Sequence, residues 1–200
     1  MKIINAIFLS LILSGCTSFP AAVLPVIDDG IPNTITKLES KQIYLSGVKT
    51  RLENTSVGQM TIGNACVNEK EFKWANNDTW DEKFRDAMIS EFAKYNYNIP
   101  LNTLEFKNQE DADILIGARM TDMVANICNA PNGIKGDAVI TIEWTIFDKA
   151  TDQTSLINTF GKGNVPRLNK EGAQQLYRDA SADAARNLMA TKEFYSIVKK

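Results

Sequence analysis

The sequence of 200 residues is weakly acidic and has an ordinary globular composition, with 44% hydrophobic residues. It contains 22 Lys and Arg, 24 Asp and Glu, and no His. A net charge of −2 excludes a strongly basic nucleic-acid-binding protein and an acidic disordered chain. The absence of His excludes Ser-His-Asp and Cys-His nucleophile pairs and any His-ligated metal site. We therefore predict no cofactor, no metal ion and no nucleic-acid partner.

The first fifteen residues have the pattern of a signal peptide. Lys2 supplies a positive charge, and residues 3–13 are almost wholly apolar. This run is too short to span a membrane as a helix, which needs about 20 residues, but it has the length of a signal-peptide apolar core. It ends in Leu13-Ser14-Gly15-Cys16, which resembles the lipobox of bacterial lipoproteins. The alternative is an ordinary secretory signal followed by a chance Cys.

The resemblance to bacterial lipoproteins implies a lipid anchor at Cys16. In that family the signal peptide is removed, and the Cys becomes the first residue and carries a diacylglycerol thioether and an N-acyl chain. Three acyl chains would hold the protein permanently on a membrane, because one chain alone binds only marginally. Thr17 stands where Asp would retain a lipoprotein in the inner membrane of enteric-type bacteria. The resemblance therefore implies an outer-membrane location facing the periplasm.

Residues 16–40 are expected to form the lipidated Cys and a flexible linker, followed by a single domain over residues 41–200. Pro20, Pro25 and Pro32 interrupt the linker. Prolines remove backbone donors and disfavour helix. Apolar residues within the linker leave open that part of it packs on the domain.

The first half of the domain predicts strands followed by a helix. Residues 42–52 have the composition of a strand, and residues 60–74 of one or two more. Thr79 and Glu82 have capping-box spacing, so a helix is expected to begin at Thr79. A single apolar stripe follows at helical spacing and indicates a face that packs on the core: it consists of Trp80, Phe84, Met88, Phe92 and Tyr95.

The second half predicts three antiparallel strands and a helix. The strands cover residues 111–128, with a bulge near 121–122, then 138–146 and 154–162. A helix over residues 169–190 carries a stripe of small residues, and Phe194, Ile197 and Val198 pin the C-terminus. The order of elements predicts an α+β fold, an antiparallel sheet of four to six strands with two helices packed on one face. The other face must be solvated or covered by a partner.

Cys66 and Cys128 remain once Cys16 is assigned to the lipid. An even pair in an oxidising compartment favours a disulfide, with two buried free thiols as the alternative. A bridge closing a loop of about 60 residues contributes about 4 kcal/mol on the chain-entropy model.

The best single candidate for acid–base chemistry is Glu143, on the polar face of a predicted strand beside Trp144. Hydrolysis by paired carboxylates needs a second carboxylate at a defined separation, which the sequence does not identify. Candidates for that second group are Glu69, Glu71, Asp81, Asp122 and Asp137. Residues 161–164, Gly-Lys-Gly-Asn, lack the spacing of a phosphate-binding loop and are better explained as a turn or the end of a hairpin.

Three segments, residues 112–128, 136–148 and 184–190, together resemble the non-catalytic region ahead of trypsin-like protease domains in some bacterial envelope proteins. More loosely, the layout is similar to periplasmic lipoproteins such as curli-export components. Both resemblances imply scaffolding or recognition. We expect a non-enzymatic, membrane-anchored lipoprotein that binds a protein partner in the cell envelope. The alternatives are a carboxylate-dependent hydrolase of envelope glycan or peptidoglycan, and a small-ligand site between sheet and helices.

Overall fold

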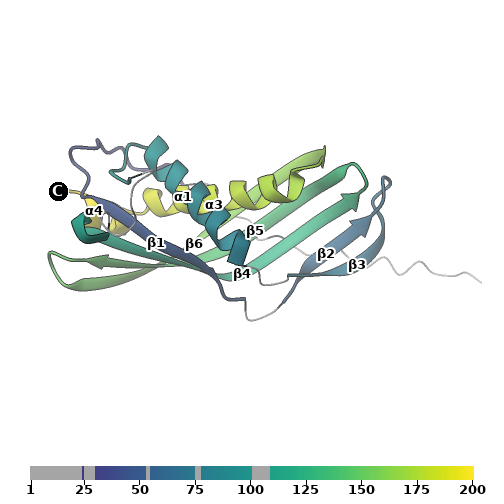
Figure 1. Ribbon diagram of the computed structural model, residues 1–200, viewed down its shortest axis with the longest axis horizontal. Coiled ribbons are helices and arrows are strands. Elements are labelled where there is room, and N and C mark those ends of the chain that lie inside the picture. Colours follow the sequence, from purple (N-terminus) through teal and green to yellow (C-terminus); the bar gives the residue numbers. More distant parts are fainter. Residues whose placement is uncertain (1–23, 25–29, 53–54, 75–77, 101–108) are drawn as a thin grey trace, which may run out of the picture.

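The computed structural model describes residue 24 and residues 30–52, 55–74, 78–100 and 109–200. Two long helices lie side by side across one face of a six-stranded sheet (Figure 1). This confirms the predicted α+β fold. The elements are β1 (Ile43–Thr50), β2 (Ser56–Ile62), β3 (Val67–Lys73), α1 (Asp78–Lys94), β4 (Ile114–Ala130), β5 (Gly133–Asp148), β6 (Gln153–Asn169), α3 (Gly172–Ala190) and α4 (Lys192–Val198).

The predicted signal peptide, the lipobox Leu13-Ser14-Gly15 and Cys16 lie outside the described residues. Within the described part of the chain, no helix combines the length and apolarity that a membrane crossing requires.

Strands β4, β5 and β6 form the antiparallel meander that the sequence predicts. Strands β5 and β6 are longer than the predicted ranges 138–146 and 154–162, because each runs on into residues that keep the ladder of hydrogen bonds. Strand β4 begins three residues after the predicted start at 111 and ends two residues after 128. The predicted bulge is present in β4, where the register with β5 shifts between Met120 and Asp122. The extra residue, Thr121, shifts the alternation by one position, so the odd-numbered Met123, Ala125 and Ile127 are buried on the same face as Met120.

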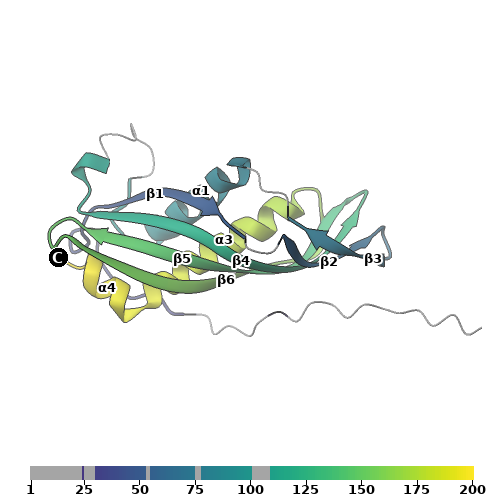
Figure 2. The same cartoon turned by 90° about the horizontal axis from the view of Figure 1, so that it is seen from below.

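The outer edge of β4 pairs with two short strands placed end to end (Figure 2). Strand β1 runs parallel to the first half of β4, with Ile43 opposite Ile114, and β2 runs parallel to the second half, with Gly58 opposite Ala125. Strand β3 then pairs antiparallel with β2. The sheet is therefore mostly antiparallel, with two parallel pairs that the sequence pattern did not indicate.

The apolar stripe of α1 packs on the core as predicted, with Phe84, Met88 and Phe92 buried. The helix begins at Asp78, one residue before the predicted start, and the Thr79 side chain lies outside the described part. Helix α3 buries the predicted small residues Ala180 and Ala184. A further short helix, α4, was not predicted; it buries Phe194 and Val198, which pin the C-terminus, and Ile197 packs partly buried against the core.

Residues 161–164 lie in the middle of β6, so their interpretation as a turn or hairpin end was wrong. A Cβ placed on Gly161 would lie 2.0 Å from the carbonyl oxygen of Ala180, and one on Gly163 would lie 2.0 Å from that of Leu176. The two glycines therefore let α3 approach the backbone of β6, which is a recognised reason for glycine in a strand.

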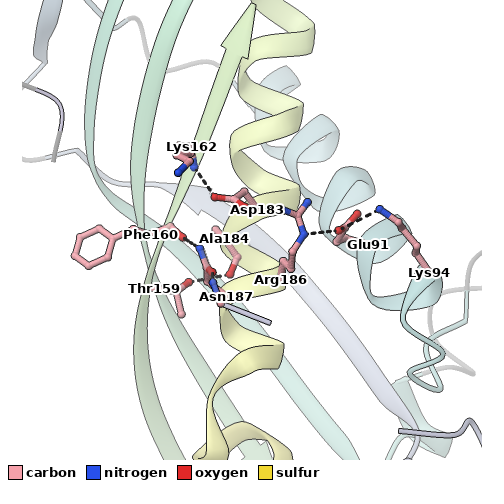
Figure 3. A network of polar contacts seen from close by, with 10 residues as sticks. Glu91, Lys94, Thr159, Phe160, Lys162, Asp183, Ala184, Arg186 and Asn187 are labelled. Atoms are coloured by element: carbon pink, nitrogen blue, oxygen red, sulfur yellow. Dashed lines mark hydrogen bonds and ion pairs between the residues drawn. The ribbon is translucent and has the colours of Figure 1, made fainter. Parts of the chain in front are cut away.

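The segment before β1 packs along α3. The amide nitrogen of Asn33 donates to the carbonyl oxygen of Met189 at 3.1 Å, and Ile35 is buried. Asn187 links this segment to the sheet: its Oδ1 accepts from the amide of Gly30 at 2.7 Å, and its Nδ2 donates to the carbonyl oxygen of Phe160 at 2.9 Å (Figure 3).

Candidate functional site

The face of the sheet turned away from α1 and α3, here called the outer face, is exposed. Alternation along β6 places Ile157 and Thr159 toward α3 and places Leu156 and Phe160 on the outer face. Leu156 is 63% exposed and Phe160 is 44% exposed. Figure 3 shows the Phe160 ring directed away from α3. Both side chains lie on the same face of β6 and are available to a partner that covers this face.

A hollow of about 980 Å³ lies on the outer face where β1, β4 and β5 run side by side. We call it the basic trough, because Lys49, Arg51 and Arg119 line it together with one carboxylate, Glu143. The side chains of Lys49 and Arg119 are 60% and 53% exposed. The trough therefore has an excess of positive charge in a protein whose formal net charge is −2.

Glu143 lies on the outer face, as the alternation of β5 predicts. It stands directly opposite Arg119 on β4, and its Oε1 is 2.7 Å from Nη2 of that guanidinium. Its sequence neighbour Trp144 points the other way, where it is buried and donates from Nε1 to Oγ1 of Thr159 at 2.7 Å. The adjacent Trp144 therefore takes no part in a site with Glu143.

The floor of the trough is bare backbone. Gly47 of β1 is paired with Gly117 of β4. A Cβ added at Gly47 meets no heavy atom within 4 Å, and one at Gly117 meets only Ser46 Oγ at 3.8 Å and Thr145 Cβ at 4.0 Å. These glycines differ from those of β6, because nothing in the fold occupies the space that their missing side chains leave open.

The end of the trough lies where β4 changes its parallel partner from β1 to β2. The bulge residue Thr121 lines the hollow at this point, and so does Arg51, which follows the last residue of β1. The amide of Arg51 still donates to the carbonyl oxygen of Met120 at 2.9 Å. The strand junction thus fixes the backbone of Arg51 beside β4 and leaves its side chain on the exposed surface.

The other carboxylates that the sequence singles out lie elsewhere. Asp81 accepts from the backbone and hydroxyl of Thr50, and Glu71 pairs with Lys73 on β3. Asp137 bonds Asn164 on the neighbouring strand. Of the described residues that line the trough, Glu143 is the only carboxylate.

The trough therefore lacks, in its described lining, the second carboxylate that glycoside hydrolysis uses at about 5–9.5 Å. A search of the described residues finds no group of three or more Cys, Asp and Glu side chains placed to hold a metal ion.

A smaller hollow of about 450 Å³ lies between α3 and β6 and corresponds to the small-ligand site considered from the sequence. Its charged side chains already bond one another. Arg186 Nη1 is 2.7 Å from Asp183 Oδ1, and the second carboxylate oxygen of Asp183 accepts from the amide of Lys162 at 2.9 Å (Figure 3). Since these groups satisfy one another, the basic trough offers the stronger polar binding surface.

Cys66 and Cys128 are joined by a disulfide, with Cα atoms 5.4 Å apart. Cys66 lies in the turn between β2 and β3, and Cys128 lies near the end of β4. The predicted bridge therefore fastens the β2–β3 hairpin to the central meander. It has a structural role and lies outside the basic trough.

Comparison with known proteins was made at the level of sequence and of structure. No family model and no curated protein matches the chain. Among solved structures, a DUF330-family protein of Xanthomonas campestris is similar with a TM-score of 0.45 and 9% identity, over 84% of this chain and 90% of that one.

Two further structures are similar at lower scores. The PelC dodecamer of Paraburkholderia phytofirmans has a TM-score of 0.36 and 9% identity, over 85% of this chain and 95% of that one. A homolog of the neuraminyllactose-binding hemagglutinin from Helicobacter pylori has a TM-score of 0.31 and 8% identity, over 87% and 95%. Similarity at this level establishes no family membership and assigns no activity. The resemblance to regions ahead of protease domains stays a prediction from the sequence.

Proposed function

We propose that the chain is a non-enzymatic lipoprotein of the cell envelope that binds a partner protein through the outer face of its sheet. The observation that carries the proposal is the exposure of this face, with Leu156, Phe160 and the basic trough on one continuous sheet whose opposite face is covered by helices. Anchoring at Cys16 is supported by the lipobox resemblance. An outer-membrane position facing the periplasm is supported by Thr17.

Contacts at two edge strands of the sheet, β1 and β6, favour docking on the face over strand addition at those edges. An incoming strand needs unpaired backbone groups along an edge. At β1, Nε of Arg85 donates to the carbonyl oxygen of Leu45 at 3.1 Å, and Asp81 Oδ1 accepts from the amide of Thr50 at 3.2 Å.

At β6 the same protection comes from α3. Asp183 accepts from the amide of Lys162, and Asn187 donates to the carbonyl oxygen of Phe160 (Figure 3). Polar side chains of α1 and α3 therefore occupy backbone groups at two of the three edge strands, β1 and β6, whereas the third edge strand, β3, pairs with β2 alone among the described strands.

Anchoring is tested by labelling cells with a palmitate analogue and fractionating their envelopes. The native chain should incorporate the label and remain with the outer membrane after a high-salt wash. A Cys16→Ala variant should incorporate none and should be released, because no acyl chain then holds it. Incorporation by the variant, or its unchanged retention, would contradict the proposal.

Docking is tested by chemical crosslinking in intact envelopes. The double variant Leu156→Asp, Phe160→Asp places two charges on the outer face, where desolvating them against a partner is costly. We expect loss of a discrete crosslinked adduct that the native chain forms. The matched control is Leu38→Asp, which changes an exposed apolar residue outside the sheet and should keep the adduct. An adduct that persists in the double variant, or the absence of any adduct for the native chain, counts against outer-face docking.

A further inference from the structure

We infer that the basic trough binds an acidic, extended segment of the partner protein, with Asp or Glu side chains between Arg119 and Arg51 and the segment's backbone over Gly47 and Gly117. This inference rests on the proposed function and adds to it the chemistry of the partner. Three observations carry it: the charge of the trough, its floor and its size.

The cations of the trough retain unused hydrogen-bonding capacity. Arg119 contacts Glu143 through Nη2, and Arg51 donates from Nη1 to the carbonyl oxygen of its neighbour Thr50 at 3.1 Å. Neither guanidinium has a further partner among the described residues. A guanidinium carries five N–H donors in a planar fork that matches a carboxylate. Both arginines can therefore receive carboxylates without giving up the bonds they make.

Lys49 adds a third cation at the rim. Its Nζ lies 3.5 Å from Asp81 Oδ2, at the outer limit of a hydrogen bond, and its side chain is largely exposed. Three cations against Glu143 leave the lining with an excess of two positive charges. Since the chain as a whole is acidic, this positive charge is a local feature of the trough.

Gly117 has no structural explanation within the described fold, whereas Gly47 directly follows a bulge in β1, where the register with β4 shifts between Leu45 and Gly47. Glycine weakens a strand by about 0.5–1 kcal/mol and usually marks a bulge, a bend or the close approach of a ligand or another backbone. Gly161 and Gly163 are explained by the approach of α3. Gly47 and Gly117 lie opposite each other and face open space. An incoming backbone that crosses the strands at this point would account for Gly117 and would use the space that Gly47 leaves open.

The size favours a chain segment over a single ion. A hollow of about 980 Å³ that is open to solvent has room for several residues, whereas an isolated phosphate or carboxylate would leave most of it empty. The hydroxyls of Thr121 and Thr145 also line the hollow and can bond backbone groups of such a segment. An acidic peptide therefore fits the charge, the floor and the volume together.

The inference is tested by fluorescence anisotropy with the detergent-solubilised full chain and a fluorescein-labelled deca-glutamate peptide. We expect the glutamate peptide to bind and a deca-glutamine peptide not to bind. Raising the salt from about 0.05 to 0.3 M should weaken binding, because the interacting charges are exposed. No binding of the glutamate peptide, or equal binding of both peptides, would overturn the inference.

Two pairs of variants separate a shaped site from diffuse attraction. Arg51→Gln with Arg119→Gln should raise the dissociation constant at least tenfold, whereas the control Arg167→Gln with Lys170→Gln removes two exposed cations elsewhere and should change it less than twofold. Gly47→Val with Gly117→Val keeps every charge and adds side chains at positions where a Cβ alone makes no close contact, so filling the floor should also weaken binding tenfold. Unchanged binding by the valine variant would show that the peptide is attracted by surface charge alone and would contradict the inference. Circular dichroism and melting temperatures of each variant verify its fold.

Two additional arms separate this inference from other ligands and from the proposed function. Inorganic phosphate and phosphatidylglycerol vesicles are tested as competitors; either of them binding where the peptide does not would replace the acidic segment by a phosphate ligand. If the peptide fails to bind while the native chain forms an adduct that the Leu156→Asp, Phe160→Asp variant loses, the chemistry inferred for the trough is wrong and outer-face docking stands. If the peptide binds and the native chain forms no adduct, the preference of the trough for acidic chains stands and partner docking in the envelope is wrong.

Discussion

Tyr97 is a buried phenol whose hydroxyl has no hydrogen-bond partner among the described residues. Its ring packs against Phe92 and Phe194. Removing a buried, unbonded hydroxyl recovers its desolvation cost. We therefore predict that Tyr97→Phe stabilises the protein by about 1 kcal/mol at neutral pH, measured by urea unfolding. Destabilisation by a similar amount would show that the hydroxyl is bonded after all.

The same residue predicts how stability depends on alkaline pH. Burial raises the pKa of Tyr97 to about 12, with a smaller contribution from the charge of Tyr195. Because the pKa is higher in the folded state, ionisation of Tyr97 leaves the free energy of unfolding unchanged below the ordinary tyrosine pKa of 10. The free energy of unfolding then falls as the pH rises toward 12. Tyr97→Phe should flatten this loss in unfolding experiments between pH 9 and 12. Burial also raises the pKa of Tyr177, so part of the loss should remain.

Two glycines of the sheet predict opposite responses to the same substitution. At Gly161 a Cβ would lie 2.0 Å from the backbone of α3, so Gly161→Val should force the helix off β6 and cost about 3 kcal/mol or more. At Gly47 the space is open, so Gly47→Val should leave the free energy of unfolding within about 1 kcal/mol of the native value. Urea denaturation of both variants provides the comparison. Similar costs at the two positions would mean that α3 does not approach β6 as described.

The disulfide is the main covalent constraint between elements of the sheet. It closes a separation of 62 residues and joins the β2–β3 turn to β4. On the chain-entropy model, its loss should lower the free energy of unfolding by about 4 kcal/mol. Guanidinium denaturation with and without dithiothreitol measures the change, and the double variant Cys66→Ala, Cys128→Ala should no longer respond to the reductant. A native midpoint that is insensitive to reduction would exclude this role.

Arg186 of α3 forms an ion pair with Glu91 of α1 where the two helices meet. Arg186 Nε lies 3.0 Å from Oε1 of Glu91 on α1, and its Nη1 bonds Asp183 one turn earlier on α3 (Figure 3). Glu91 is buried, so Glu91→Gln removes the charge that compensates Arg186. We expect a loss of about 2–3 kcal/mol, within the range for breaking a largely buried pair.

Lys94 supplies the control for this coupling. Its Nζ also approaches Glu91, at 3.6 Å, but its side chain is mostly exposed. Exposed ion pairs contribute about 0–1 kcal/mol. Lys94→Gln should therefore have little effect in the same urea titrations. Equal losses for the two variants would indicate that burial of Glu91 does not determine the strength of the contact.

The elements that sequence analysis predicted are those whose pattern is local. The alternation of Ala138 to Ile146 identifies both faces of β5, and it places Glu143 correctly on the outer one. The parallel pairing of β1 and β2 with β4 could not be predicted in this way, because the composition of a strand does not identify its partner, and β4 follows later in the chain. This pairing brings Lys49 and Arg51 beside Arg119. The basic trough was therefore missed, although the paired glycines at 47 and 117 are a signal that the correct register would have made visible.

At the scale of the whole molecule, the segment before β1 is bonded to the end of β5 and to α4. Nζ of Lys41 lies 2.9 Å from Oδ2 of Asp148, at the end of β5, and the amide of Lys41 donates to the carbonyl oxygen of Val198. One residue thus connects the N-terminal segment, the sheet and α4. Burial acts to raise the pKa of Asp148, but hydrogen bonds from Lys41 and the Ala150 amide, together with the charge of Lys41, outweigh it and hold the pKa below its usual value.

This contact predicts the acid limit of the folded state. A carboxyl with a lowered folded-state pKa stabilises the protein fully above its ordinary pKa of 3.8, and the contribution is lost as the pH falls through the lower, folded value. Asp148→Asn should therefore be less stable at pH 7 and show a flatter loss of melting temperature between pH 4 and 2. The control Asp179→Asn changes a carboxylate that is much more exposed on α3 and should keep the native acid profile. Because Lys41 joins three separate parts of the chain, the native protein should lose its N-terminal, sheet and α4 contacts in one cooperative acid transition, and separate transitions for tryptophan fluorescence and far-ultraviolet circular dichroism would contradict that coupling.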